Sequence, residues 1–475
     1  MAPQDWAELI SYLAAPSQAD WVALEHGEDR LTIKELAEAM LCAAGVLSES
    51  AGVVAVSEAD PIAHTVAVLG AVAAGRAAML IDPKQPEPIL REVTRQANVT
   101  TIIGRAVEGV ESISYQDLIG GDPTALTEVS PQSVGSILLT SGSTGTPKLV
   151  LRSRNADLHA AMCLRLASFP IGPGDRHWLC VPYAGAPFHS LVMGSLLARA
   201  TVVFAPFARD CVDDFLSERD ISSVYLVPTM LRLAREHGGL DGPGWRGLRA
   251  LMTGGEKLDE QTAEVLLERF EGRVYCAYGM TELPRPTEAT FEEIAARPGT
   301  VGRTIPFRQV RIAEIESEEE VAIGDEGEVL VTGPDLFIGY LGQEPVGDWY
   351  RTGDLGRLDE EGYLYITGRA SSILKVGGNR VSTDEVAAAL RTHEGVAQAA
   401  VVAVPDPTWT NRLVAFVVPR NQPAVSRDDL LAWLKDQQPI YKVPRTVIFI
   451  ADLPVDSSGK VSLQKLQALA EEDAL

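Results

Sequence analysis

The N-terminal part of the chain alternates between two patterns of hydrophobic positions. Short apolar runs such as residues 53–56 indicate buried strands, whereas the spacing in residues 36–47 and the small side chains of residues 65–74 indicate helices. Further apolar segments of this alternation lie at residues 77–83, 200–204, 223–227 and 248–253. Strands that alternate with helices predict an α/β fold with parallel sheets covered on both faces. In such folds ligands bind beyond the carboxyl ends of the strands.

Two changes of pattern divide the rest of the chain. After residue 301, short alternating strands predict a small β subdomain, at residues 310–313, 327–332 and 363–366. From residue 371 a separate α+β pattern begins, with helices at 383–391 and 427–435 and strands at 397–404 and 413–418. Since 475 residues exceed one ordinary core, we expect a large N-terminal domain, residues 1–369, and a smaller C-terminal α+β domain, residues 370–475.

Composition and charge narrow the class of protein. With 46% hydrophobic and 22% charged residues the chain is typical of a globular protein. A formal charge of -24 argues against binding to nucleic acid or to an anionic membrane surface. The sequence has neither a signal-peptide pattern at its start nor an apolar stretch of membrane-spanning length, so we expect a cytoplasmic protein. Five scattered cysteines indicate neither a disulfide framework nor a zinc site.

The first candidate chemistry is a loop of glycine and hydroxyl residues that follows an apolar run and ends in a lysine. Its backbone N–H groups, hydroxyls and single cation together suit a polyphosphate. Because Thr146 and Pro147 separate Gly145 from Lys148, the spacing is not that of a P-loop NTPase. Taken alone, such a run is equally typical of a turn or linker. The candidate phosphate-binding residues are Thr140, Ser141, Gly142, Ser143, Thr144, Gly145 and Lys148.

Further motifs follow in a fixed order. They are the segment Tyr278, Gly279, Met280, Thr281 and Glu282, then residues 350–355, the pair Gly368 and Arg369, and residues 457–460. Together with the loop, this set resembles the adenylate-forming superfamily of acyl-CoA synthetases, peptide-synthetase adenylation domains and luciferases. The resemblance extends from residue 31 to Lys460. It implies ATP-dependent activation of a carboxylic acid as an acyl adenylate, followed by transfer to a thiol.

The resemblance implies a role for each phosphate-handling residue. The reaction brings a carboxylate to the α-phosphate of ATP, so its catalysis depends on positioning and on cations. Lys460 is expected to contact both the substrate carboxylate and the α-phosphate, and Thr281 to contact the α-phosphate. The hydroxyl loop and Lys148 are expected to bind the β- and γ-phosphates, and Glu282 to bind Mg²⁺ as a hard oxygen ligand.

The resemblance also assigns the nucleotide and thiol contacts. Asp354 is expected to accept both ribose hydroxyls, with Arg369 as a nearby donor. Paired glycines Gly377 and Gly378 match a loop that swings in for thioester formation, although the hinge position before it, commonly Asp or Lys, is Ser371 here. The adenine and acyl wall is expected to comprise Tyr278, Gly279, Met280, Gly254, Gly255 and Glu256.

The choice of acid depends on His189. In amino-acid-activating relatives an aspartate at this place pairs with the substrate ammonium, whereas this chain has a histidine, so a free α-amino acid is disfavoured. A histidine here resembles acyl- and aryl-CoA ligases, where it gates the acyl pocket; on its own it is more often a core residue. The expected lining of an apolar or aromatic acid is Met193, Val227, Met230, Gly254 and Met280.

We therefore expect an acid–thiol ligase that uses ATP, Mg²⁺ and coenzyme A. An alternative is a stand-alone adenylation enzyme that loads the phosphopantetheine of an acyl or peptidyl carrier protein. A third hypothesis, a non-catalytic adenylate-binding relative, fits poorly because Lys460, Glu282, Asp354 and Lys148 are all present.

Overall fold

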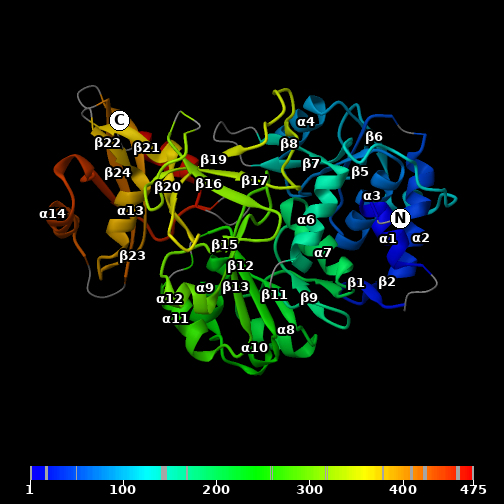
Figure 1. Cartoon of the computed structure of the whole chain (residues 1–475), viewed down its shortest axis with the longest axis horizontal. Coiled ribbons are helices and arrows are strands. Elements are labelled where there is room, and N and C mark those ends of the chain that lie inside the picture. Colours follow the sequence, from blue (N-terminus) through cyan, green and yellow to red (C-terminus); the bar gives the residue numbers. More distant parts are fainter. Residues whose placement is uncertain are drawn as a thin grey trace. The chain divides into compact units, whose positions relative to one another are not determined.

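The structure is a computed structural model in which the chain forms two compact units. The first unit comprises Met1–Val310 and Val331–Tyr350, and the second comprises Arg311–Leu330 and Arg351–Leu475. Figure 1 shows the elements of both. The structure describes residues 3–15, 20–49, 51–140, 147–166, 169–256, 258, 260–315, 317, 319–376, 379–406, 410–420, 425–455 and 461–472.

A nine-stranded sheet forms one half of the first unit. Its central strands run parallel, as the alternating pattern predicts, and antiparallel strands close both edges. The order across the sheet is β15 (Arg303–Thr304), β14 (Thr287–Thr290), β13 (Arg273–Tyr278), β12 (Ala250–Gly254), β11 (Ser223–Tyr225), β9 (Arg176–Leu179), β10 (Thr201–Phe204), β1 (Val22–His26) and β2 (Asp29–Thr32).

A seven-stranded sheet forms the other half of the first unit. The strands β7, β4, β3, β5 and β6 are parallel neighbours in that order, whereas β7 and β8 form an antiparallel pair. The order is β18 (Gly339–Tyr340), β8 (Lys148–Ser153), β7 (Val134–Thr140), β4 (Ala77–Leu80), β3 (Val53–Ser57), β5 (Val99–Gly104) and β6 (Glu111–Ile113).

Helices cover these sheets in three layers. The largest core lies between the two sheets and includes α1 (Trp6–Leu13), α2 (Ile33–Leu47), α3 (Pro61–Ala73), α6 (Arg154–Leu166) and α7 (Met193–Leu197) (Figure 1). A second core covers the outer face of the nine-stranded sheet with α8 (Val212–Glu218), α9 (Pro228–His237), α10 (Pro243–Gly247), α11 (Glu260–Arg269) and α12 (Phe291–Ala296). α4 (Glu87–Gln96) covers the outer face of the seven-stranded sheet, and α5 (Tyr115–Ile119) contacts α2.

The second unit carries three smaller sheets. The first is four-stranded, in the order β16 (Gln309–Ala313), β17 (Gly327–Thr332), β19 (Tyr350–Leu358) and β20 (Leu364–Arg369). The others are the hairpin of β21 (Ile373–Val376) and β22 (Asn379–Ser382), and a sheet of β23 (Val396–Asp406), β24 (Thr410–Pro419) and β25 (Thr446–Phe449). Its helices are α13 (Thr383–Arg391), α14 (Arg427–Gln437) and α15 (Leu463–Glu472). The predicted fold class is therefore confirmed, while the predicted boundary between residues 369 and 370 stays a prediction.

Local capping explains where the predicted helices begin. α2 starts at Ile33 and not at residue 36, because Thr32 and Glu35 form a reciprocal capping box. α3 starts at Pro61 and not at residue 65, because the Asp60 carboxylate accepts from Ala63 N and proline suits the first turn. Apolar spacing alone therefore locates these helices but misses their first turns.

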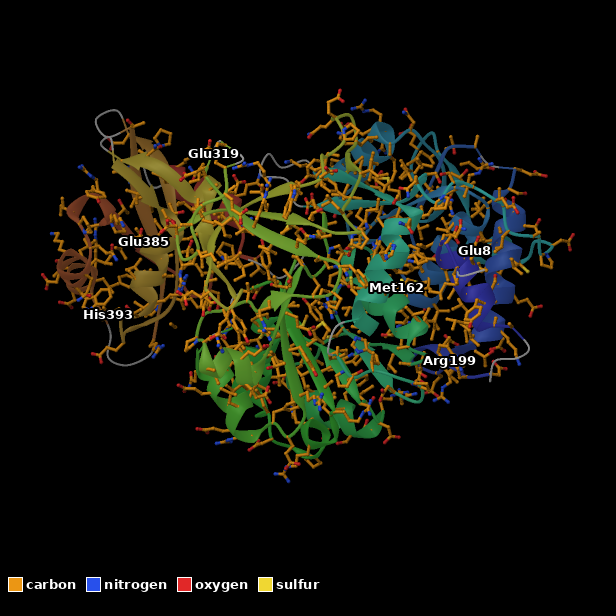
Figure 2. All side chains as sticks on the ribbon, viewed as in Figure 1. Glu8, Met162, Arg199, Glu319, Glu385 and His393 are labelled. Carbon is orange, nitrogen blue, oxygen red and sulfur yellow. The ribbon has the colours of Figure 1, made fainter. Side chains whose placement is uncertain are left out.

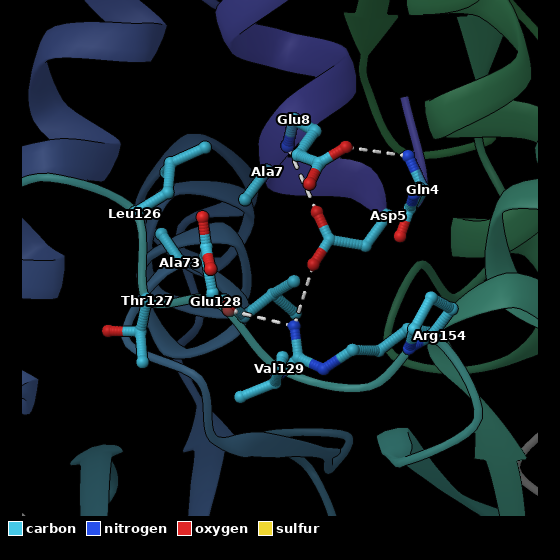
Figure 3. A pocket seen from close by; sticks show the side chains of 12 residues that line it. Gln4, Asp5, Ala7, Glu8, Ala73, Leu126, Thr127, Glu128, Val129 and Arg154 are labelled. Atoms are coloured by element: carbon cyan, nitrogen blue, oxygen red, sulfur yellow. Dashed lines mark hydrogen bonds and ion pairs between the residues drawn. The ribbon is translucent and has the colours of Figure 1, made fainter. Parts of the chain in front are cut away.

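A cavity of about 260 Å³ lies near α1 in the first unit (Figure 3). Arg154 closes one side of it, because its Nη1 donates to Asp5 Oδ2 and to Val72 O, each at 2.9 Å. No described residue among the predicted site residues lines this cavity. Acidic side chains such as Glu8 on α1 and Glu385 on α13 lie exposed on their respective units (Figure 2). Within the described ranges, no helix combines the length and apolarity needed to cross a bilayer.

Candidate active site

The carboxyl edge of the nine-stranded sheet gathers most of the predicted wall residues. β11, β12 and β13 are parallel neighbours, so Val227, Gly254 and Tyr278 follow or end adjacent strands at one edge. A Cβ on Gly254 would lie 2.3 Å from Ala277 O, so the close packing of β12 against β13 requires glycine there. Thr229 Oγ1 donates to Glu256 Oε2 at 2.8 Å, which joins α9 to the segment after β12.

The predicted Thr281 and Glu282 lie in a tight turn after β13. Gly279 makes the turn possible, because a Cβ there would lie 2.4 Å from Arg285 N. Within the turn Met280 N donates to Leu283 O at 3.3 Å. Thr281 O accepts from Arg152 Nη1 at 3.2 Å, so the turn is tied to β8 of the other sheet.

The side chain of Tyr340, which the sequence did not indicate as a site residue, contacts both Glu282, the expected metal ligand, and Lys148, the expected phosphate ligand. Tyr340 Oη donates to Glu282 Oε1 at 2.5 Å, and the Lys148 ammonium lies 4.8 Å from the centroid of the Tyr340 ring. Lys148 pairs with Thr140 across β7 and β8, so both predicted residues flank the predicted phosphate loop. The residues Ser141, Gly142, Ser143, Thr144 and Gly145 lie outside the described residues.

The Tyr340 hydroxyl is held in its protonated form. Burial raises its pKa, and the hydrogen bonds with Glu282 and Tyr350 raise it further because they favour the neutral phenol. The two tyrosine hydroxyls lie 2.9 Å apart. Tyr340 is therefore a hydrogen-bond donor to the Glu282 carboxylate throughout the neutral pH range.

His189 is fully buried in the π-helical turn η1 (Phe188–Val192), a local widening of the helix that leads into α7. Its Nε2 lies 2.8 Å from Asp157 Oδ1 and 2.9 Å from Ser136 Oγ. Burial lowers the pKa of the ring, against the opposing effect of the Asp157 carboxylate. Met193 is also fully buried, in the core between the sheets. The acyl-pocket roles of these two residues stay predictions.

Asp157 is also the partner of a buried arginine. Arg152 Nε donates to Asp157 Oδ1 at 3.0 Å, and the two side chains are 0% and 2% exposed. Arg152 therefore connects the Asp157 and His189 pair with the Thr281 turn described above. A charged residue inside the apolar strand β8 was the one signal in the sequence that could have indicated this network. The contact of Tyr340 with Glu282 spans 58 residues and leaves no local signal.

The second unit brings together the two residues expected at the ribose. Asp354 and Arg369 are opposite each other in the antiparallel pair of β19 and β20, and Arg369 Nε donates to Asp354 Oδ1 at 3.0 Å. Asp354 is 8% exposed. Lys460, Gly377 and Gly378 lie outside the described residues, so their predicted roles stay predictions.

The chain matches two family models along most of its length. Residues 13–341 match the AMP-binding enzyme model, and residues 385–460 match the AMP-binding enzyme C-terminal domain. It is 30% identical over 379 residues to the 3-hydroxybenzoate--CoA/4-hydroxybenzoate--CoA ligase of Thauera aromatica, covering 76% of this chain and 71% of that protein. The chain therefore belongs to the AMP-binding enzyme family.

Solved structures support the same fold. ATP-bound MatB from Rhodopseudomonas palustris superposes with a TM-score of 0.89 at 22% identity, over 99% of each chain. The o-succinylbenzoate coenzyme A synthetase MenE from Bacillus subtilis, in complex with ATP and a magnesium ion, gives a TM-score of 0.84 at 23% identity, over 98% of this chain and 99% of that chain. At these identities the likeness establishes the fold alone.

The first prediction concerns the buried ion pair. Replacement of Asp157 by Asn leaves the Arg152 charge buried without its counter-ion, which costs about 3–5 kcal/mol of unfolding free energy. Urea denaturation followed by circular dichroism measures the loss. The matched control is Glu87→Gln, which weakens the solvent-exposed ion pairs with Arg91 and Arg105 and should cost far less unfolding free energy. Equal losses in the two variants would contradict the importance of burial.

The second prediction concerns acid stability. His64 is a fully buried residue of α3, and burial lowers its pKa to about 3. In the unfolded chain this histidine has its ordinary pKa, so as the pH falls it takes up a proton in the unfolded state before it does so in the folded state. The stability due to neutral His64 is thus fully present above about pH 7 and decreases below pH 6.5, by about 2 kcal/mol at pH 5. In a His64→Leu variant the loss of unfolding free energy between pH 7 and pH 5 should be smaller by this amount. The exposed His237→Leu control should behave like the parent, and an unchanged pH dependence in His64→Leu would refute the assignment.

Proposed function

We propose that the protein is an AMP-forming acid–thiol ligase. A carboxylate oxygen of the substrate attacks the α-phosphorus of ATP, the bond to the β-phosphate breaks, and pyrophosphate leaves. The thiol of coenzyme A then attacks the acyl carbon, loses its proton, and displaces AMP. The observation that carries this proposal is the meeting of Glu282 and Lys148 at Tyr340, within a chain of the AMP-binding enzyme family.

In this proposal residues of the first unit bind the polyphosphate of ATP. Lys148 and the hydroxyl loop bind the β- and γ-phosphates, and Glu282 holds Mg²⁺, which would neutralise charge on the phosphate oxygens. No described part of the chain contains a group of three or more His, Cys, Asp and Glu residues that could hold a metal. One carboxylate nevertheless fits Mg²⁺, because this ion is commonly bound by one or two carboxylates together with substrate phosphates.

The second unit would supply the nucleoside and catalytic contacts. Arg369 Nε donates to Asp354 Oδ1, and the Asp354 carboxylate would accept the ribose hydroxyls. Lys460 would contribute the cation that approaches the substrate carboxylate and the α-phosphate, which repel each other. Gly377 and Gly378 would allow close approach of the pantetheine arm during thioester formation.

The proposed substrate is an apolar or aromatic carboxylic acid. Val227 and Met230 are partly buried side chains at the start of α9, beside the carboxyl edge of the sheet. His189 is neutral and offers no negative charge to a substrate ammonium, which disfavours a free α-amino acid. The hydroxybenzoate ligase relative supports an aromatic acid and coenzyme A as the acceptor. No observation favours a carrier protein.

A substrate panel tests the proposal. We expect ATP-dependent release of pyrophosphate with aromatic acids such as 3-hydroxybenzoate, 4-hydroxybenzoate or o-succinylbenzoate, and no release with free α-amino acids. Addition of coenzyme A should then yield AMP and the acyl thioester, detected by mass spectrometry. Turnover that is restricted to amino acids would overturn the proposed substrate class, and the absence of pyrophosphate release with every acid would overturn the proposed reaction.

Lys460→Ala gives a sharper test of the mechanism. Loss of a cation directed at developing negative charge should lower the rate of adenylate formation by about 10²–10³-fold, with an unchanged circular dichroism spectrum. The matched control is Lys465→Ala, which removes an exposed lysine of α15 close by in the sequence and should leave the rate within about twofold. Adenylation at the parental rate in Lys460→Ala would exclude this lysine from the reaction.

A further inference from the structure

Tyr340 is placed by the backbone of the strand that begins with Lys148. It belongs to β18, which pairs antiparallel with β8 so that Tyr340 lies opposite Val150. Ile338 N donates to Leu151 O at 2.8 Å, and Leu341 N donates to Leu149 O at 2.9 Å. Hydrogen bonds on both sides thus fix the position of the Tyr340 backbone relative to β8.

The Tyr340 side chain is fixed in direction as well. Its ring packs edge-on against Phe337, with centroids 5.1 Å apart, and Phe337 packs in the same way against Tyr350 at 5.0 Å. Phe337 N also donates to Glu282 O at 2.9 Å, so the segment that carries Tyr340 holds the backbone of the expected metal ligand. The hydroxyl and the ring of Tyr340 are therefore presented to Glu282 and Lys148 by a pre-formed support.

One side chain thus makes two different contacts with the phosphate-handling residues. The hydroxyl donates to Glu282 Oε1, which restricts the rotamers of that carboxylate and leaves its second oxygen with full acceptor capacity. The face of the ring lies under the Lys148 ammonium, where a cation is attracted by the electrons of the aromatic ring. A smaller or aliphatic residue could make neither contact.

We propose that Tyr340 is a positioning residue that orients the carboxylate of Glu282 for Mg²⁺ through its hydroxyl and holds the Lys148 ammonium through its ring. This inference rests on the proposed function, because it takes Glu282 as the metal ligand. Partners that orient a metal ligand by hydrogen bonding commonly change metal affinity by 10–100-fold when they are removed. The two contacts are separable, since phenylalanine keeps the ring and loses the hydroxyl.

The test measures ATP binding by calorimetry at increasing Mg²⁺ concentration, without carboxylic acid or coenzyme A, so that no turnover occurs. Tyr340→Phe should raise the half-saturating Mg²⁺ concentration about tenfold and leave ATP binding in EDTA unchanged. Tyr340→Leu should show the same Mg²⁺ shift and should also weaken ATP binding in EDTA by about two- to fivefold, because Lys148 loses the ring.

Two controls separate positioning from general loss of structure. Tyr350→Phe removes the neighbouring hydroxyl and keeps the Tyr340 contact with Glu282, so its Mg²⁺ requirement should stay within about twofold of the parent. In a Glu282→Gln background the Tyr340→Phe change should add no further shift. Thermal unfolding of each variant checks that it is folded.

The outcomes distinguish this inference from the proposed function. A parental protein without Mg²⁺-dependent ATP binding would overturn the proposed function itself. A parent that binds MgATP, together with a Tyr340→Phe variant of equal Mg²⁺ requirement, would overturn the role of Tyr340 alone. A shift of equal size in Tyr350→Phe, or one that persists in the Glu282→Gln background, would also overturn it.

Discussion

The buried ion pair between Arg152 and Asp157 is the constraint on which the arrangement of the first unit depends. Removing two charges from water is costly, and their attraction offsets that cost only where geometry and hydrogen bonds are good. Here Arg152 lies on β8 and Asp157 on α6, and the pair also engages His189 and the carbonyl of Thr281. A shift of β8 against α6 would leave a buried charge without a partner, and a shift of the Thr281 turn would break its hydrogen bond with Arg152, so these contacts fix the register of the three segments.

This register has a consequence for the phosphate-handling residues. β8 begins with Lys148, and the turn held by Arg152 continues directly into Glu282. The same ion pair that secures the core therefore also limits where a cation and a carboxylate of the candidate site can lie. In a chain of net charge -24, an anionic nucleotide gains no attraction from the protein as a whole. Local placement of a few cations must provide it, and Lys148 is placed by its pairing with Thr140 and by the Tyr340 ring.

The sequence predicted the fold class because its signals are local and repeated. Apolar runs at the period of strands, alternating with helical spacing, were enough to predict parallel sheets, and the ends of β12 and β13 lie at the expected edge. Contacts such as that between Tyr340 and Glu282 were not predictable, because they depend on β18 joining β8 far along the chain. The environment of His189 could not be predicted from the sequence for another reason. A π-helical turn sets its direction, and the apolar pattern of the segment does not reveal one.

The environment of His189 also bears on how the proposed enzyme would disfavour amino acids. An aspartate in its place would be buried near the Asp157 carboxylate, and burial beside a like charge opposes ionisation. The single Arg152 guanidinium already compensates Asp157, so it could not balance a second buried charge as well. A change at residue 189 alone would therefore not create an ammonium site in this protein. Discrimination against amino acids would lie in the whole buried network, which has to change together before the charge preference of the site can change.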